Sequence, residues 1–338
     1  MTSEAKNMIK TLDTLPDFPK FEDIPVSTKT FIVMTNLTID IAKLFEFLPI
    51  TEYILVPKRR GRKKKNTNVD PNKNIPDGSI ITLDLANNIR GVVLKKKKKN
   101  DDKTTDYFRN SVTVVMVIDG KKINFKISRN GKFQMTGCKQ DHHAESCVKY
   151  IWEYIKDSQD VYTIPEKHSF KAIFIPAMRN IDFSLGFVLD REKLDEYFNT
   201  FTQYYSLLET SIGYTGVNIK IPVTKPITEL QIKELTYRRG NWLKPKFIPY
   251  QNYLDTLKPK EQQKKLDKER YNTFLVFHSG KVIMSSMCED FARETYYEFL
   301  DIIRENYKEF EEKLEDMEIK PKKASKKAVA AEVEEILV

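Results

Sequence analysis

Two stretches of this chain carry the same pattern, and this internal repeat constrains the fold more than any single motif does. Residues 124–155 read NFKISRNGKFQMTGCKQDHHAESCVKYIWEYI, and residues 272–303 read NTFLVFHSGKVIMSSMCEDFARETYYEFLDII. When Gly131 is aligned with Gly280, no gap is needed from there to the end of both stretches. We therefore predict that the chain contains two copies of one structural unit.

Each copy is predicted to form a strand, a tight turn, a second strand and an amphipathic helix. Asn130 and Gly131 favour a type I′ turn, because both central positions of that turn need positive φ. The flanking residues alternate between apolar and polar, which is typical of strands with one buried face. Asp141 is predicted to cap the helix that follows. The apolar positions predicted to lie beneath the helices are Phe125, Ile127, Phe133, Met135, Phe274, Val276, Val282 and Met284.

The remaining elements are expected from apolar periodicity and from signals at their ends. Strands are expected at 30–37, 79–85, 90–94, 111–118, 170–178 and 217–221, and helices at 39–48, 191–201 and 260–270. The organisation that follows is a flexible N-terminal arm at 1–27, a first repeat with basic insertions at 28–160, a second repeat at 161–310 with an insertion at 224–270, and a tail at 311–338.

The chain has a net charge of +9, so a polyanion is the first partner to consider. Much of this charge lies in two loops, Lys58–Lys65 and Lys95–Lys99. Such loops are a nuclear-import signal, a phosphate-contacting surface or a solvated insertion, and the sequence leaves these alternatives open. Their basic residues are Lys58, Arg59, Arg60, Arg62, Lys63, Lys64, Lys65, Lys95, Lys96, Lys97, Lys98 and Lys99.

Cysteine usage indicates a reducing compartment, because Cys138, Cys147 and Cys288 make no even framework. The sequence shows no secretory signal and no apolar run of membrane-spanning length. We therefore expect an intracellular, soluble protein with no membrane partner.

Catalytic and metal-binding patterns are weak. No glycine-rich phosphate loop opens a helix, and no local set of nucleophile and base is present, so we expect no enzyme, cofactor or small-molecule substrate. Cys138, His142, His143 and Cys147 are ligand types, and the last two are four residues apart on one helical face. A structural zinc site needs four ligands in a recognisable pair spacing, so we expect a buried thiol and surface histidines without metal.

Three segments resemble a known family. Residues 277–286 (FHSGKVIMSS) and 128–139 (SRNGKFQMTGCK) resemble the segment FVSGKVVLTGAK of the TATA-box-binding protein (TBP) family. Residues 170–185 (FKAIFIPAMRNIDFSL) resemble its segment FKIQNIVGSCDVKFPI. The resemblance covers both halves, and the Lys/Asn/Ile-rich insertions look most like the TBP-like proteins of large DNA viruses.

The resemblance implies an α+β saddle, in which two pseudo-symmetric repeats form one curved antiparallel sheet with helices on the convex side. The minor groove of DNA would lie under the concave side, where phenylalanine wedges open base steps. Carried over to this chain, the DNA-binding positions are Ile32, Lys126, Ser128, Gln134, Thr136, Tyr214, Leu275, Phe277, Ile283 and Ser285.

The chain departs from the family at the positions that read DNA. Phe277 and Tyr214 fall on wedge positions in the second half, whereas Ser128 in the first half cannot unstack a base step. The groove-reading asparagines of the family fall on Thr30 and Phe174. We therefore expect relaxed or altered TATA specificity.

The resemblance implies a transcription-initiation factor that binds double-stranded promoter DNA and carries RNA polymerase or another initiation factor on its convex face. It would act in the nucleus or in a cytoplasmic viral factory, or be packaged in the virion. The alternative is a structural or interaction scaffold of the same fold that binds a protein or packaged nucleic acid without sequence preference. The polar first half of the concave side favours this alternative.

Overall fold

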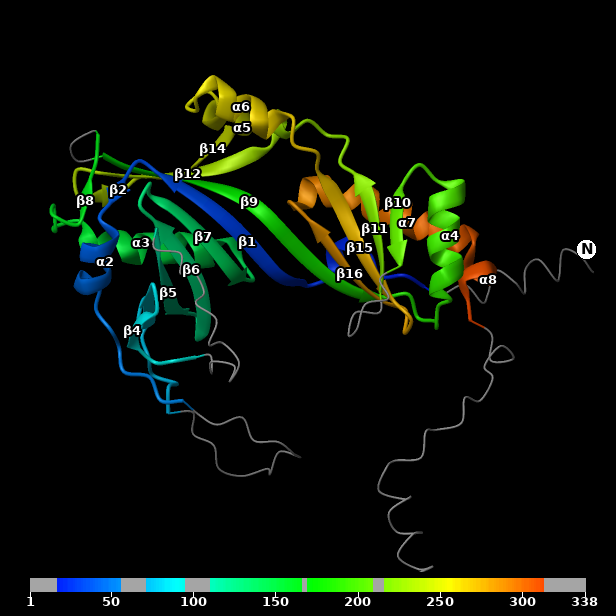
Figure 1. Ribbon diagram of the computed structural model, residues 1–338, viewed down its shortest axis with the longest axis horizontal. Coiled ribbons are helices and arrows are strands. Elements are labelled where there is room, and N and C mark those ends of the chain that lie inside the picture. Colours follow the sequence, from blue (N-terminus) through cyan, green and yellow to red (C-terminus); the bar gives the residue numbers. More distant parts are fainter. Residues whose placement is uncertain (1–16, 56–70, 95–109, 166–168, 209–215, 313–338) are drawn as a thin grey trace, which may run out of the picture.

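The computed structural model describes residues 17–55, 71–94, 110–165, 169–208 and 216–312. Figure 1 shows them arranged around a large antiparallel sheet with helices packed against it, so the chain is an α+β protein as the sequence predicts. Both predicted strand–turn–strand–helix units are confirmed. The first consists of β6 (Lys121–Ser128), β7 (Lys132–Cys138) and α3 (Asp141–Ile155), and the second of β15 (Tyr271–Phe277), β16 (Lys281–Ser286) and α7 (Glu289–Glu305).

The other elements of the two halves also follow a common order. The first half adds β1 (Val26–Thr35), α2 (Ile41–Phe47), β3 (Ile80–Leu85), β4 (Asn88–Gly91) and β5 (Ser111–Ile118). The second half adds β9 (Ser169–Ser184), α4 (Arg191–Phe201), β10 (Tyr205–Leu208), β11 (Gly216–Pro222) and α8 (Tyr307–Phe310). Two short strands, β2 (Thr38–Ile39) and β8 (Tyr162–Thr163), pair outside the main sheet.

Read outward from the centre of the sheet, the first four strands follow the same order on both sides. β1 and β9 pair in the middle; β7, β6, β5 and β3 follow on one side, where β4 adds a further edge strand, and β16, β15, β11 and β10 follow on the other. In Figure 1 the two central strands run side by side, with α2 and α3 near one end of the molecule and α4 and α7 near the other.

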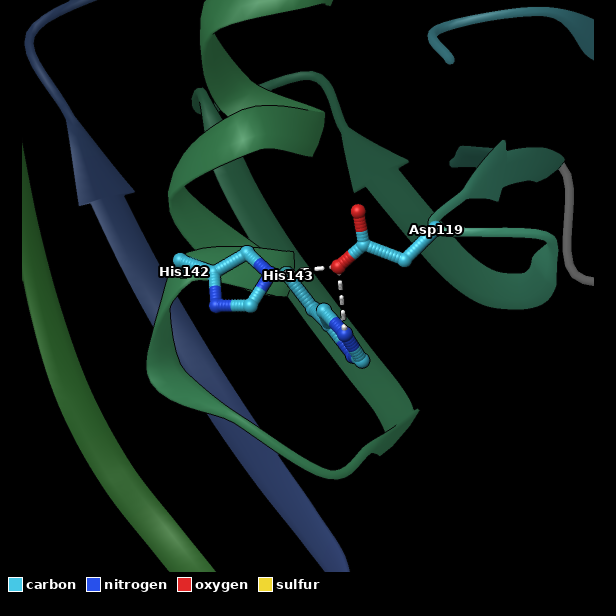
Figure 2. Close-up of side chains that lie close together, drawn as sticks. All are labelled: Asp119, His142 and His143. Atoms are coloured by element: carbon cyan, nitrogen blue, oxygen red, sulfur yellow. Dashed lines mark hydrogen bonds and ion pairs between the residues drawn. The ribbon is translucent and has the colours of Figure 1, made fainter. Parts of the chain in front are cut away.

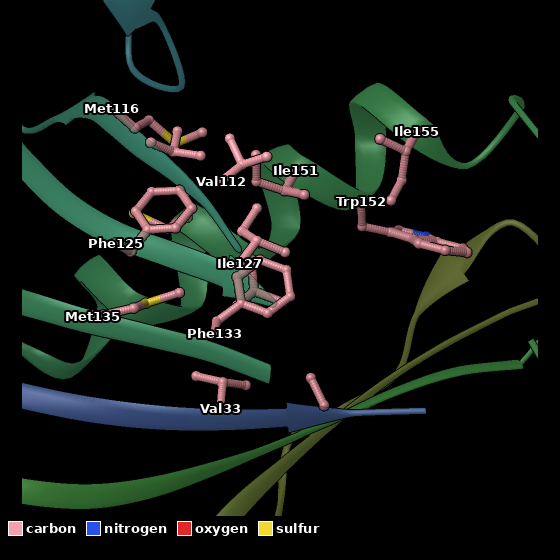
Figure 3. Packing of buried hydrophobic residues seen from close by; sticks show 14 of the residues in the cluster. Val33, Val112, Met116, Phe125, Ile127, Phe133, Met135, Ile151, Trp152 and Ile155 are labelled. Carbon is pink, nitrogen blue, oxygen red and sulfur yellow. The ribbon is translucent and has the colours of Figure 1, made fainter. Parts of the chain in front are cut away.

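Each half has its own apolar core between the sheet and its helices. In the first half, Phe125 and Phe133 from neighbouring strands pack near Ile151 and Trp152 of α3, as Figure 3 shows. In the second half, the Phe274 ring stacks on Phe299 of α7 with centroids 4.2 Å apart. All eight positions predicted to lie beneath the helices are buried. Burial of side chains this size contributes roughly 1.5–3 kcal/mol each, which holds the helices on this face.

Two sequence predictions near element ends were wrong in detail. Gln140, not Asp141, is the N-cap residue of α3, and Asp141 is the first helical residue. Its carboxylate still lies in the first turn, where negative charge favours the positive end of the helix dipole. The arm predicted to be flexible at 1–27 is packed in the part that the structure describes: Phe18, Phe21 and Ile24 are buried in the core of the second half.

The insertion at 224–270 is a folded unit. It contains a 3-10 turn (Ile227–Glu229), β12 (Gln231–Arg238), β13 (Asn241–Trp242), β14 (Lys246–Pro249), α5 (Tyr250–Leu254) and α6 (Pro259–Leu266). β12 pairs with residues 169–174 of β9, whereas β16 pairs with residues 179–184 along the same strand. The insertion therefore extends the central sheet at an edge that β16 does not reach. The helix expected at 260–270 is confirmed as α6, although it ends at Leu266.

Candidate nucleic-acid interface

The two faces of the sheet differ in what covers them. We call the face under α2, α3, α4 and α7 the outer face, and the opposite face, which bears Lys126, Gln134, Leu275 and Ile283, the inner face. Alternation along each strand separates the two faces: Phe125 and Ile127 are buried in the core, whereas Lys126 between them is exposed. The inner face therefore contains the positions expected to contact DNA.

In the first half, the inner face is polar. Lys126 is the direct register partner of Gln134 on β7, and both side chains are exposed. Thr136 is also exposed, and Ser128 is half-buried opposite Ser111 of β5. These groups can donate to or accept from phosphates, sugars or water, but none is an apolar wedge.

In the second half, the inner face is apolar. Leu275 on β15 and Ile283 on β16 are direct register partners, and both are half-buried. Phe277 is half-buried at the end of β15, opposite Gly216. A Cβ atom at Gly216 would lie 2.7 Å from Cδ1 of Leu275, so glycine leaves this corner free for the larger side chains. We call Leu275, Phe277 and Ile283 the apolar patch.

Some expected DNA contacts lie outside the described residues, and one position aligned with the family's groove-reading asparagines lies in the core. Tyr214 and both basic loops, Lys58–Lys65 and Lys95–Lys99, lie outside the residues that the structure describes. Phe174, which the family alignment placed at a groove-reading position, is buried in the core of the outer face. Its register partner is Val33, another core residue, so that alignment was wrong at this position.

Part of the inner face lies under the insertion. Ile32 and Met34 of β1 line a groove with a volume of about 730 Å³ together with side chains of α5 and α6. Ile175, the register partner of Ile32, is buried in a small core with Tyr250 and Tyr253 of α5. In Figure 1, α5 and α6 lie beside the central strands at the top of the view. We call this space the α6 groove.

The walls of the α6 groove are cationic. Lys264, Lys265 and Lys268 come from α6 and the residues just after it, Arg270 precedes β15, and Lys132 comes from the first half. Burial lowers the pKa of Lys265, and the positive charges of Lys132 and Lys268 lower it further. Glu261 and Glu269 are the two carboxylates that line the groove. The groove therefore has a surplus of positive charge over an apolar floor.

No local motif marks these cations as a site. The segment KKLDKER at 264–270 lies within the predicted insertion and has no pattern of its own that indicates a ligand. These cations form a site only together with Lys132, which belongs to the other half of the chain and lines the same groove. Of the residues expected to bind DNA, the groove brings together Ile32 and Ser285.

The far end of the inner face in the first half is also covered. Ile81, Val115 and Val117 form a small buried cluster there, against which Tyr53 and Ile75 pack. Lys122 Nζ lies 4.9 Å from the centre of the Tyr53 ring. Tyr53 and Ile75 therefore reduce the accessible area of the inner face at this end of the first half.

The thiol–histidine region forms a hydrogen-bonded cluster near the start of α3. Asp119 Oδ2 lies 2.5 Å from His142 Nε2 and 3.3 Å from His143 Nε2, as Figure 2 shows. Cys138 and Cys147 are buried instead in the core, and burial raises the pKa of both thiols, that of Cys138 to about 11. Among the described residues, Asp119, His142 and His143 lie close enough together to share a metal ion, and neither thiol belongs to this group.

The tautomer of His143 disfavours metal binding. Its Nδ1 accepts a hydrogen bond from the Lys139 backbone N–H at 3.3 Å, so the neutral ring carries its proton on Nε2. That N–H donates to Asp119. A histidine that binds metal through Nε2 needs the opposite tautomer, with the proton on Nδ1. Among the described residues, these three side chains are arranged as a hydrogen-bonded connection between the β5–β6 turn and α3.

Comparisons with known proteins give limited similarity. No protein-family model matches the chain. A curated relative, "Uncharacterized protein 335L" of Invertebrate iridescent virus 6, is 28% identical over 199 residues, which are 57% of this chain. The chain spans 59% of that relative's length. A solved structure named Methanococcus jannaschii TBP is 15% identical, with a TM-score of 0.37, and the match covers 85% of this chain and 99% of that one. No helix among the described residues is long and apolar enough to cross a membrane.

Proposed function

We propose that this chain is a TBP-like, DNA-binding transcription-initiation factor with relaxed or altered TATA specificity. In this proposal its sheet is a saddle built from two TBP-like repeats, and double-stranded DNA binds the inner face through the minor groove. The observation that carries the proposal is the apolar patch on the inner face. Leu275, Phe277 and Ile283 lie there within one pair of strands and are only half-buried.

The patch has the chemistry that a minor-groove binder needs. Contiguous apolar side chains on a protein surface usually mark a contact site. A phenylalanine among them is a suitable wedge, because unstacking a base step costs a few kcal/mol that only a buried apolar contact offsets. The repeated strand order outward from β1 and β9, together with the sequence resemblance, supports the saddle.

Altered specificity follows from the rest of the inner face. Lys126, Gln134 and Thr136 are exposed polar side chains and lack a wedge. Ile32 lies in the α6 groove, so its side chain is not on an unobstructed surface. We infer that this half contacts the DNA backbone more than the base edges, and contacts of that kind position a protein without reading sequence.

The outer face is proposed as the site for RNA polymerase or another initiation factor, since the inner face is occupied by DNA. The protein would act without catalysis, in the nucleus or in a cytoplasmic viral factory, or be packaged in the virion. The second candidate is an interaction scaffold that binds a protein or packaged nucleic acid without sequence preference. The coverage of the inner face by the insertion favours this candidate, because it narrows the surface open to a duplex.

Footprinting tests the choice. The full chain is incubated with AT-rich promoter DNA and, separately, with a shuffled duplex of the same composition. The proposal expects a defined protected segment and tighter binding on the promoter DNA. Equal affinity for both duplexes would contradict the proposed sequence-specific initiation factor and would favour the interaction scaffold.

A further inference from the structure

The cations of the α6 groove come from parts of the chain that are distant in sequence. Lys132 follows the β6–β7 turn in the first half, whereas Lys264, Lys265 and Lys268 belong to the insertion in the second half. Bringing like charges together costs free energy, and two carboxylates do not neutralise five cations. An arrangement of this kind is typical of a site whose missing negative charge is supplied by a ligand.

Local structural roles account for only part of this charge. Lys264 and Lys265 lie in the last turn of α6, where cations favour the negative end of the helix dipole. Arg270 donates from Nη2 to the Lys265 carbonyl at 2.6 Å and from Nη1 to the Lys268 carbonyl at 2.7 Å, so it closes the helix end. Neither role explains Lys132 or Lys268.

Lys265 is held in place rather than free in solvent. Its Nζ lies 5.6 Å from the centre of the Tyr253 ring, a cation–π distance, and its side chain is half-buried. The Tyr253 ring is itself buried in the small core of the insertion. The position of this charge is therefore set by a rigid support, which lowers the entropy cost of binding an anion.

The groove is continuous with the apolar patch. Thr273 and Ser285 are register partners that line the groove, and the next pair along the same two strands on this face is Leu275 and Ile283. A nucleic-acid strand with its phosphates in the α6 groove would therefore continue along this face to the apolar patch. The floor, with Ile32 and Met34, suits sugar and base surfaces, and the walls suit phosphate.

We propose that the α6 groove holds the phosphodiester backbone of one nucleic-acid strand, with Lys132, Lys264, Lys265 and Lys268 as the phosphate contacts. The inference rests on the proposed function, since the same nucleic acid also contacts the apolar patch. It assigns to the insertion a role that the repeated units do not supply: a cationic wall along one side of the inner face.

The test measures how DNA affinity depends on salt. Each phosphate contact contributes about 0.9 to the slope of log affinity against log salt for duplex DNA, and about 0.7 for a single strand. The triple variant Lys264→Gln/Lys265→Gln/Lys268→Gln is expected to lower the slope by about 2–3 on duplex DNA. Lys132→Gln alone, on a different element, is expected to lower it by about 1. A matched control replaces three exposed lysines outside the groove, Lys43, Lys139 and Lys308.

Four outcomes are distinguishable. A smaller slope for both groove variants, with the control unchanged and all melting temperatures equal, supports the proposal. A wild-type protein that binds neither duplex nor single-stranded DNA overturns the proposed function and this inference together. A wild-type protein that binds DNA with a slope unaffected by either groove variant overturns this inference alone. Weaker poly-glutamate binding by the groove variants, with an unchanged DNA slope, would assign the groove to an acidic protein and overturn it as well.

Discussion

Lys29 on β1 and Arg179 on β9 are register partners at the centre of the sheet, and each reaches the first turn of the long helix in its own half. Lys29 Nζ lies 2.7 Å from Asp141 Oδ1 of α3, and Arg179 Nη2 lies 3.7 Å from Glu289 Oε2 of α7. The same relationship thus occurs once in each half, around the pair of strands that joins them. Both ion pairs are on the outer face, which places α3 and α7 on the same side of the sheet.

Arg179→Met is expected to leave the melting temperature unchanged or to raise it. Arg179 is buried, neither its Nε nor its Nη1 has a hydrogen-bond partner among the described residues, and burial lowers its pKa. The cost of desolvating such a charge can exceed what one long ion pair and the cation–π contact of Arg179 Cζ, 5.0 Å from the centre of the Phe21 ring, contribute, whereas methionine would still pack against that ring. Lys29→Met is the comparison and should cost at most about 1 kcal/mol. A destabilisation above roughly 3 kcal/mol in Arg179→Met would mean that the ion pair stabilises the fold.

Phe277→Ala is expected to remove most of the bend that the protein imposes on DNA, because Phe277 is the wedge of the apolar patch. Ser128→Ala should change the bend little, because serine at the corresponding place cannot intercalate. We therefore expect one kink rather than two, measured as DNA end-to-end distance by energy transfer. If the wild type leaves DNA straight, or Phe277→Ala bends it equally well, the inner face should be assigned to a protein partner.

Neutralising Lys58–Lys65 and Lys95–Lys99 is expected to weaken binding to all duplexes alike, because phosphate contacts carry no sequence information. Every phosphate that is no longer neutralised should reduce the salt slope by about 0.9. The measurement is a titration of promoter and shuffled duplexes at several salt concentrations. An unchanged slope would show that these loops are solvated insertions.

Cys147→Ala is expected to cost about 1 kcal/mol of stability, since it removes one buried sulfur from a packed core. A chelator should leave the melting temperature of the wild type unchanged, because neither Cys138 nor Cys147 lies within ligand distance of the histidines and His143 Nδ1 already accepts from the Lys139 N–H. Thermal unfolding with and without chelator measures both effects. Stoichiometric zinc in the purified protein, removed together with stability on chelation, would contradict this prediction.

Stability is expected to fall as the pH drops below about 6.5, in part because of His143. Burial lowers the pKa of His143 below its ordinary value, so the unfolded chain binds a proton more readily than the folded one. The stabilising contribution is therefore present above the unfolded pKa and is lost as the pH falls toward the folded one. His143→Asn, which keeps an acceptor near the Lys139 N–H, should flatten the dependence of melting temperature on pH between about 7.5 and 5. Parallel curves for wild type and variant would assign the acid sensitivity to other groups.

The pH range separates His143 from its neighbour Asp119. The pKa of Asp119 is lowered, first by its hydrogen bond with His142, so its contribution is lost only at lower pH, below the ordinary range of a carboxyl group. A loss of stability just below the ordinary pKa of histidine that depends on His143, and a second loss at lower pH that does not, would fit the observed cluster.

The sequence by itself determined the local units. Apolar–polar alternation on both sides of the turns at Gly131 and Gly280 predicted β6, β7, β15 and β16 within a few residues of their bounds. Apolar residues at helical spacing predicted α3 and α7 in the same way. These signals are local, because they depend on neighbours in the chain. The same alternation separated Lys126 and Gln134 from the buried residues between them. The start of α4 at Arg191 also agrees with the helix expected at 191–201, because its cap is a local contact in which Asp190 accepts from the N–H groups of Glu192 and Lys193.

Only the tertiary structure decided what covers the inner face. Lys132 and Lys265 line one groove although they belong to different halves, and no local pattern relates them. The insertion lies there because Ile175 on β9 packs with Tyr250 and Tyr253, a contact between distant segments. The bulge between Thr30 and Phe31 also shifts the β1–β9 register, so a gapless alignment could not place Phe174 on the correct face. Periodicity along the chain indicates which residues are buried. Which distant residues they contact depends on how the elements pack in three dimensions.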